Sequence, residues 1–177
     1  MKRVLCILEN GFEEIEAVTP VDLLRRAGVE VVLAGVSGKT VTGKCGIRIE
    51  ADALLGDVSG RDFDALFLPG GPAVMDLRKN PEVLDLIRDF SGDEKLIAAI
   101  CAAPLLLHDA GVLEGRKFTA HFTTTDELPE NCNDRVVRDG LFITSRGAGT
   151  ALDFGLELVA VLAGDAVRDE IAASIMV

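Results

Sequence analysis

The sequence has 177 residues, 49% of them hydrophobic, which is enough for one hydrophobic core and short for two domains. We therefore expect a single domain over residues 1–177. The chain carries 18 basic and 29 acidic residues, for a formal net charge of −11. This charge argues against general binding to nucleic acid or to anionic membranes, because both repel an acidic surface.

The apolar runs are short and are interrupted by charged residues or glycine, so no membrane-spanning segment is predicted. The first apolar run ends at Glu9, which is too early for a secretory signal, and a cytoplasmic protein is expected. The four cysteines are widely spaced and include no Cys-x-x-Cys pair. Neither a metal site nor a disulfide framework is predicted.

The first third of the chain predicts a β-α-β unit. The continuous apolar run Val4–Leu8 is typical of a strand buried on both faces. Residues Glu13–Ala27 have helical spacing, with Pro20 marking a kink or a restart. Val29–Ala34 predicts a second strand. Residues 37–49 then predict short antiparallel strands outside this unit.

The rest of the chain continues the alternation of strands and helices. Phe63–Leu68 and Leu96–Ile100 predict core strands, followed respectively by helices at Glu82–Phe90 and Ala102–Ala110. Three weaker strands and a last helix are predicted at residues 117–119, 136–138, 141–144 and 150–162. This order predicts an α/β fold, with a doubly wound, mostly parallel sheet between layers of helices.

Ligands of open parallel sheets bind outside the carboxyl ends of the strands, and three segments meet this condition. Cys101 directly follows the strand 96–100, and Gly70 and Gly71 follow the strand 63–68. Glu16 lies in the helix that follows the first strand. We therefore expect these residues to share one edge of the sheet.

Cys101 has two interpretations, a reactive thiol or a small buried side chain. A turn from strand into helix favours the reactive form, with a depressed pKa. Glu16 is placed to share a proton with this sulfur, whereas Glu13 and Glu14 are expected to stay solvated near the helix start. The amides of Gly71 and Ala102 would hold an oxyanion, although a Gly-Gly pair is also typical of a plain tight turn.

The sequence has two histidines, which differ in their distance from Cys101. His108 is nearly two helical turns beyond the cysteine, about 10 Å along the axis, and is interpreted as a helix-surface residue. His121 follows the predicted strand 117–119, again at a strand end. It is the better candidate for a base or an orienting partner, with a structural role as the alternative.

Five ordered segments strongly resemble the ThiJ/PfpI (DJ-one/PfpI) superfamily, in particular the branch of parkinsonism-associated deglycases and their bacterial relatives. They are 10–16 (NGFEEIE), 20–28 (PVDLLRRAG), 68–71 (LPGG), 98–104 (AAICAAP) and 144–150 (TSRGAGT). The resemblance runs from about residue 2 to residue 170. It implies a flavodoxin-like sandwich, similar to class I glutamine amidotransferases, and a homodimer.

The resemblance also implies roles for individual residues. Cys101 would be the nucleophile, Glu16 its protonated neighbour and His121 the nearby histidine. Gly70, Gly71 and Ala102 would supply the backbone of the site. Residues placed near the site or the dimer contact would be Asp22, Arg26, Arg146 and Gly147. Phe122 stands where this branch often has proline, which leaves the orientation of His121 open.

Three functions are compatible with these residues. The first is a cofactor-free deglycase or glyoxalase acting on methylglyoxal, glyoxal or their adducts and protecting against carbonyl and oxidative stress. The second is a redox sensor or redox-regulated chaperone that uses an oxidisable Cys101. A cysteine peptidase or amidotransferase is third, since these enzymes need an aligned Cys-His-acid relay.

Overall fold

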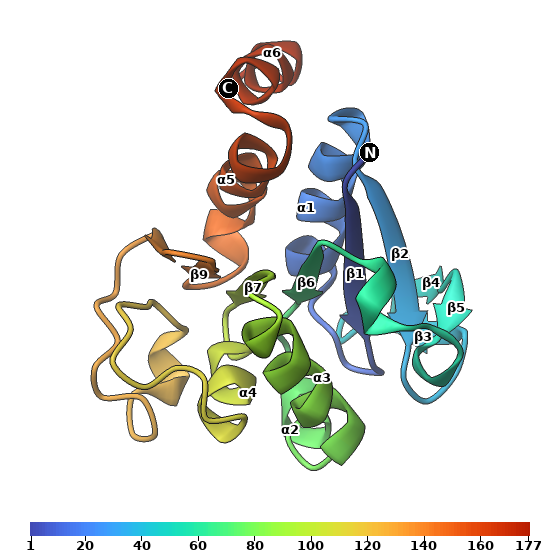
Figure 1. The fold of residues 1–177 in the computed structure, drawn as a ribbon, viewed down its shortest axis with the longest axis vertical. Helices are drawn as coiled ribbons and strands as arrows, with labels where there is room; N and C mark the ends of the chain where they lie inside the picture. Colours follow the sequence, from blue (N-terminus) through green and yellow to red (C-terminus); the bar gives the residue numbers. More distant parts are fainter.

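The computed structural model describes residues 1–177 and is built around a seven-stranded sheet (Figure 1). The strand order is β5-β2-β1-β6-β7-β9-β8, and every neighbouring pair is parallel except β8 and β9. The strands are β1 (Arg3–Leu8), β2 (Glu30–Gly35), β5 (Ala53–Leu54), β6 (Ala65–Leu68), β7 (Leu96–Ile100), β8 (Val136–Asp139) and β9 (Phe142–Ser145). A separate antiparallel hairpin pairs β3 (Thr40–Thr42) with β4 (Arg48–Glu50).

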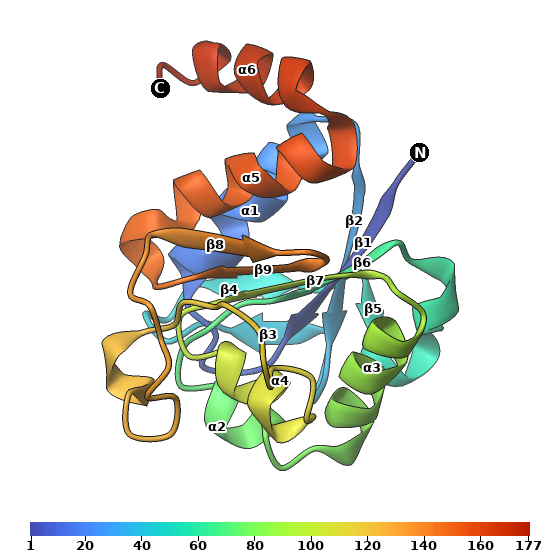
Figure 2. The same cartoon turned by 60° about the vertical axis from the view of Figure 1, so that its left-hand side comes forward.

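Helices cover both faces of the sheet, as the two views in Figures 1 and 2 show. One face carries α1 (Glu14–Arg26) and α5 (Ala151–Ala163), with α6 (Asp165–Ser174) packed on α5. The other carries α2 (Val74–Leu77), α3 (Pro81–Gly92) and α4 (Pro104–Asp109). The architecture is therefore flavodoxin-like, as the family resemblance implies. None of these helices is both long and apolar enough to cross a membrane.

The core divides into two hydrophobic clusters, one on each side of the sheet. Along β1, Val4, Cys6 and Leu8 belong to the cluster that includes α1 and α5. Leu5 and Ile7 belong to the cluster that includes α3 and α4. This alternation follows from the two-residue period of a strand, and it explains why the β1 sequence is apolar throughout. The predicted β-α-β unit is confirmed.

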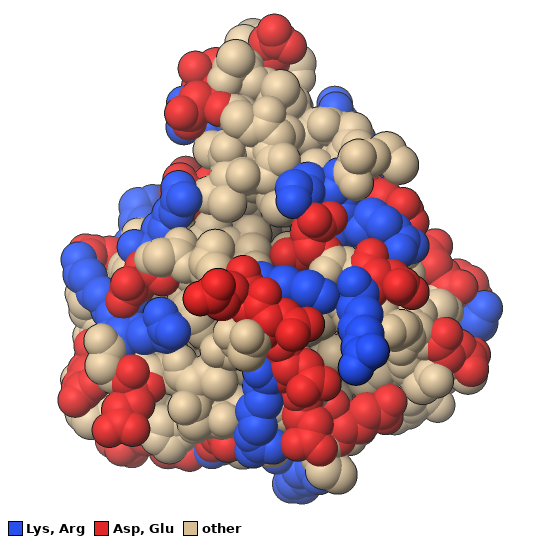
Figure 3. Space-filling model, in the orientation of Figure 1, with Lys and Arg blue, Asp and Glu red and all other residues tan.

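The charged surface is mixed. On the face shown in Figure 3, acidic and basic side chains intermingle, with a largely uncharged strip over α5. Many charged side chains of the protein form exposed ion pairs, such as Lys2 with Asp64 at 2.7 Å and Arg26 with Asp22 at 2.6 Å. Exposed pairs of this kind add little to stability, so the fold depends on its two apolar clusters.

Two expectations about local structure are wrong, and one helix was not expected. Residues 117–119 form no strand, because Thr119 N–H donates to Thr144 Oγ1 at 3.0 Å instead of to a strand backbone. The helix after β7 begins at Pro104 rather than Ala102. Helix α6 was not predicted at all. Its residues mix acidic and apolar side chains, and Ile171 alone is fully buried.

Helix α1, which carries Glu16, crosses α5 at a point with no space for a side chain. A Cβ on Gly155 of α5 would lie 2.6 Å from Leu23 Cδ1 and 3.0 Å from Pro20 Cα. Pro20 lies within α1, which continues through it as one helix. The glycine therefore sets how closely α5 approaches the helix that positions Glu16.

We expect Gly155→Val to lower the free energy of unfolding by about 1–3 kcal/mol, because the new side chain overpacks this crossing. Urea denaturation followed by circular dichroism measures the change. Gly92→Val is the matched control, since nothing lies within 4 Å of a Cβ at Gly92 in α3. Equal stability of the two variants would show that the crossing is not tightly constrained.

Candidate active site

Cys101 occupies a sharp turn between β7 and α4. Its φ of 67° lies in the left-handed region, which is strained for a residue with a side chain. Two backbone hydrogen bonds hold the turn: Cys101 N–H donates to Ser145 O, and Cys101 O accepts from His121 N–H, both at 2.8 Å. The fold therefore imposes this conformation on the cysteine from both sides.

Glu16 lies beside Cys101, with which its carboxyl interacts, and is almost completely buried at 1% exposure. Its Oε2 accepts a hydrogen bond from Gly70 N–H at 3.1 Å. A Cβ on Gly70 would lie only 2.5 Å from Glu16 Oε2 and 2.6 Å from Cys101 Cβ. A glycine is needed at position 70, because any side chain would occupy the space where the carboxyl and the cysteine meet.

Burial and mutual interaction shift the pKa values of both groups. Burial raises the pKa of Glu16 to about 7, while its interaction with the Cys101 thiol opposes this rise. Burial and the negative charge of Glu16 raise the pKa of the Cys101 thiol to about 12. The expected depression of the Cys101 pKa is therefore wrong, and burial is the largest cause of the rise. Because the state of each group shifts the pKa of the other, the two groups titrate as a coupled pair.

Backbone amides oppose part of the rise in the pKa of the Cys101 thiol. The N–H groups of Gly71 and Ala102 act on Cys101 and lower the pKa of its thiol. Gly71 has a φ of 95°, and a Cβ there would lie 2.6 Å from both Glu13 N and Gly11 O. The glycine thus permits a backbone conformation that brings its N–H to the sulfur. Such donors stabilise negative charge on sulfur or on a neighbouring oxygen.

His121 joins the site through its backbone, and its ring is held by its neighbours. The ring Nδ1 lies 2.8 Å from Thr123 Oγ1, and the ring packs on Phe122 with centroids 4.3 Å apart. Partial burial and the charge of Lys44 lower the pKa of His121. His108 instead lies on exposed helix surface beside Asp109, as predicted.

Two acidic residues are buried where the sequence predicts solvent exposure. Glu13 and Glu14 were expected to be solvated, but their exposures are 7% and 5%. Glu14 Oε1 accepts hydrogen bonds from Cys45 N–H at 2.8 Å and Ile47 N–H at 3.3 Å. Glu14 therefore anchors the tip of the β3–β4 hairpin against α1.

This hairpin brings in a residue that sequence reasoning missed. Lys44 Nζ lies 2.9 Å from Glu13 Oε2. The positive charge of Lys44 also lowers the pKa of Glu16 and of His121. The only signal available was the hairpin itself, because nothing in the sequence places residue 44 across the edge of the sheet.

The remaining candidates separate into two groups. Asp22 and Arg26 pair with each other on the exposed side of α1. Arg146 and Gly147 lie beside His121, and a Cβ on Gly147 would lie 3.4 Å from His121 Cδ2. The structure therefore brings the second group, but not the first, to the candidate site within one chain.

The fold and site define a class: flavodoxin-like α/β proteins with a cysteine at a strained turn after a central strand. The model of the DJ-1/PfpI family matches residues 2–161, and the chain belongs to this family. The crystal structure of Drosophila melanogaster DJ-1beta superposes with a TM-score of 0.94 at 38% identity, covering 99% of this chain and 98% of that one.

Several relatives are named for an activity. The chain is 38% identical to the glutathione-independent glyoxalase DJR-1.2 of Caenorhabditis elegans, over 86% of this chain and 83% of the relative. It is 34% identical to the deglycase PfpI of Pyrococcus furiosus, over 90% of this chain and 99% of the relative. The expected family and its fold are confirmed.

We expect Cys101→Ala to raise the pKa of Glu16 above its value of about 7, because the thiol interaction that stabilises the carboxylate is lost. Carboxyl-carbon NMR of the glutamate-labelled protein across pH 5–9 measures this shift. Cys132→Ala is the control, since Cys132 interacts with Asp134. A fall in the pKa of Glu16 in Cys101→Ala would instead place the resting negative charge on sulfur.

Proposed function

We propose that this protein is a cysteine-dependent, cofactor-free glyoxalase or deglycase acting on methylglyoxal, glyoxal and their adducts. The observation that carries the proposal is the contact between Cys101, in its left-handed turn, and the buried Glu16. The two relatives named for glyoxalase and deglycase activity support the same assignment. In the cell this chemistry protects against carbonyl and oxidative stress.

The first step is addition of Cys101 sulfur to the aldehyde carbon. The thiol proton passes to Glu16, whose pKa of about 7 suits it to accept and return a proton near neutrality. The carbonyl oxygen becomes an alkoxide held by the Gly71 and Ala102 amides. Protonation of this oxygen gives a hemithioacetal.

The second step moves hydrogen between the two carbons of the dicarbonyl. Glu16 takes the proton from the former aldehyde carbon and returns it to the neighbouring carbon. The hydroxyl proton moves from the hemithioacetal oxygen to the former ketone oxygen, and the product is a thioester of a hydroxy acid. Water then cleaves the thioester and restores the Cys101 thiol. The aldehyde carbon is oxidised and the ketone carbon reduced, so no external electron acceptor is needed. His121 is the candidate to orient this water.

The predicted outcome is that the pure protein converts methylglyoxal to lactate, and that Cys101→Ala lowers kcat/KM at least about 100-fold because the nucleophile is lost. Lactate is measured with an enzymatic assay. Cys132→Ala is the matched control and should retain activity. Equal lactate production by the wild type and Cys101→Ala would contradict the proposal.

Redox sensing, alone or as a redox-regulated chaperone, is the second candidate. Cys101 is partly exposed, while Gly71 and Ala102 amides act on its sulfur. These groups would stabilise an oxidised, negatively charged sulfur as well as a thiolate. Protonated Glu16 would donate a hydrogen bond to a sulfinate oxygen.

Under mild peroxide we expect two oxygen atoms to be added selectively at Cys101, because its neighbours stabilise the sulfinate. Mass spectrometry of proteolytic peptides measures each cysteine. Cys45, which is exposed, and Cys132, which is half-buried, are internal controls. Equal oxidation of the three would remove the support for a sensor.

A cysteine peptidase or amidotransferase is less well supported. These enzymes need an acid that orients the histidine, whereas the His121 Nδ1 contacts the Thr123 hydroxyl. The Cys101 side chain, in addition, interacts with Glu16.

A homodimer, a single domain over residues 1–177 and a cytoplasmic location remain part of the proposal. The exposed apolar residues Ile15 and Val18 on α1, 54% and 47% exposed, support a contact between subunits. Asp22 and Arg26 on the same helix would lie on the dimer side.

The proposed cytoplasmic location rests on the cysteines. The four free cysteines fit a reducing compartment.

A further inference from the structure

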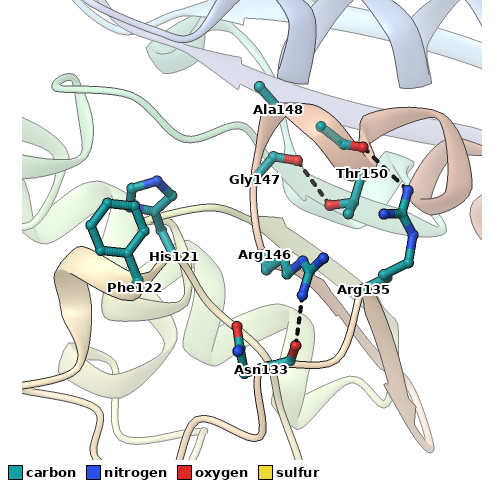
Figure 4. A pocket seen from close by; sticks show the side chains of 9 residues that line it. His121, Phe122, Asn133, Arg135, Arg146, Gly147, Ala148 and Thr150 are labelled. Carbon is teal, nitrogen blue, oxygen red and sulfur yellow. Dashed lines mark hydrogen bonds between the residues drawn. The ribbon is translucent and has the colours of Figure 1, made fainter.

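A cavity of about 480 Å³ opens next to His121 (Figure 4), and neither Cys101 nor Glu16 is among its lining residues. Its walls come from the segment around His121 and from the loop that follows β9. Among its lining residues are His121, Phe122, Asn133, Arg135, Arg146 and Gly147. Methylglyoxal is far smaller than this space, so the cavity has room for a further part of a substrate.

Arg146 is the cation of this cavity that has no carboxylate partner. Its guanidinium donates to the backbone oxygen of Asn133 at 3.0 Å and takes part in none of the ion pairs of the structure. The neighbouring Arg135, by contrast, pairs with Asp153. In a chain with 29 acidic residues, a half-buried arginine left without an acid has donors available for an anionic ligand.

Backbone hydrogen bonds connect the walls of the cavity to the turn that carries Cys101. Arg146 follows Ser145, whose carbonyl accepts the Cys101 N–H bond, and His121 N–H donates to the Cys101 carbonyl. Both walls of the cavity are thus one hydrogen bond away from the backbone of Cys101. A substrate that spans both places would hold its carbonyl carbon at the sulfur and its other end along these walls.

We propose that Arg146 forms an anion subsite that selects dicarbonyl substrates carrying a carboxylate at the end remote from the aldehyde. The guanidinium binds a carboxylate through two parallel hydrogen bonds, which gives both affinity and orientation. This inference rests on the proposed glyoxalase function, which it makes more specific.

A suitable substrate is 4,5-dioxopentanoate, an α-ketoaldehyde with a carboxylate two methylene groups away. Cys101 would add to its aldehyde carbon, and the hydrogen shift and hydrolysis described above would give 2-hydroxyglutarate. One water is consumed, the aldehyde carbon is oxidised and the ketone carbon is reduced. The neutral comparison substrate is 2-oxopentanal, which has the same dicarbonyl and a propyl tail.

The test begins with binding, which does not depend on turnover. Calorimetric titration with 2-hydroxyglutarate, compared with 2-hydroxypentanoate, measures what the remote carboxylate contributes. We expect Arg146→Met to weaken binding of 2-hydroxyglutarate about tenfold or more relative to 2-hydroxypentanoate, since a charge-assisted contact is lost. Arg61→Met is the matched control, because Arg61 is exposed in the short helix just before β6, at the amino end of that strand.

Kinetics follow from the same variants. The ratio of kcat/KM for 4,5-dioxopentanoate to that for 2-oxopentanal is expected to fall about tenfold in Arg146→Met and to stay at the wild-type value in Arg61→Met. Equal binding of the two hydroxy acids by the wild type, or equal loss in both variants, would overturn the subsite. Binding that depends on Arg146, without turnover of any dicarbonyl, would retain the subsite and reject the glyoxalase function.

Discussion

The burial of Glu16 at the edge of the sheet is the constraint on which the site depends. A carboxyl group that is 1% exposed has a pKa of about 7, so it holds and releases a proton near neutrality. Its position is determined from several sides: α1 carries it, Gly70 N–H binds it, and Gly155 fixes how closely α5 packs on α1. Burial and the negative charge of Glu16 both raise the pKa of the Cys101 thiol, so the sulfur can carry a negative charge only when Glu16 is protonated.

The main sheet could be predicted from sequence because its strands are apolar on both faces. Runs such as Val4–Leu8 and Leu96–Ile100 show this pattern without ambiguity. The strand prediction for residues 117–119 failed because Phe118 is buried without belonging to a strand. The backbone of this segment bonds to a side chain instead. Helix α6 was missed in the sequence because a helix that packs mainly on one neighbour needs only a narrow apolar stripe.

The part of the candidate site that lies just after the ends of strands could be predicted from the sequence. Cys101, Gly71 and Glu16 follow strands, and the rule for parallel sheets places them together. Lys44 could not be found in this way, because it comes from a hairpin whose contact with α1 is made by Glu14. The pKa direction of Cys101 was also beyond the sequence, since it depends on burial and on the charge of a neighbour.

The left-handed turn at Cys101 has a consequence for how the family's sequences can change. Glycine adopts this conformation without strain, so replacement of the cysteine by glycine would relax the backbone while removing the sulfur. Selection for stability alone would therefore favour glycine at position 101. A cysteine at position 101 therefore carries a backbone strain that a glycine would not.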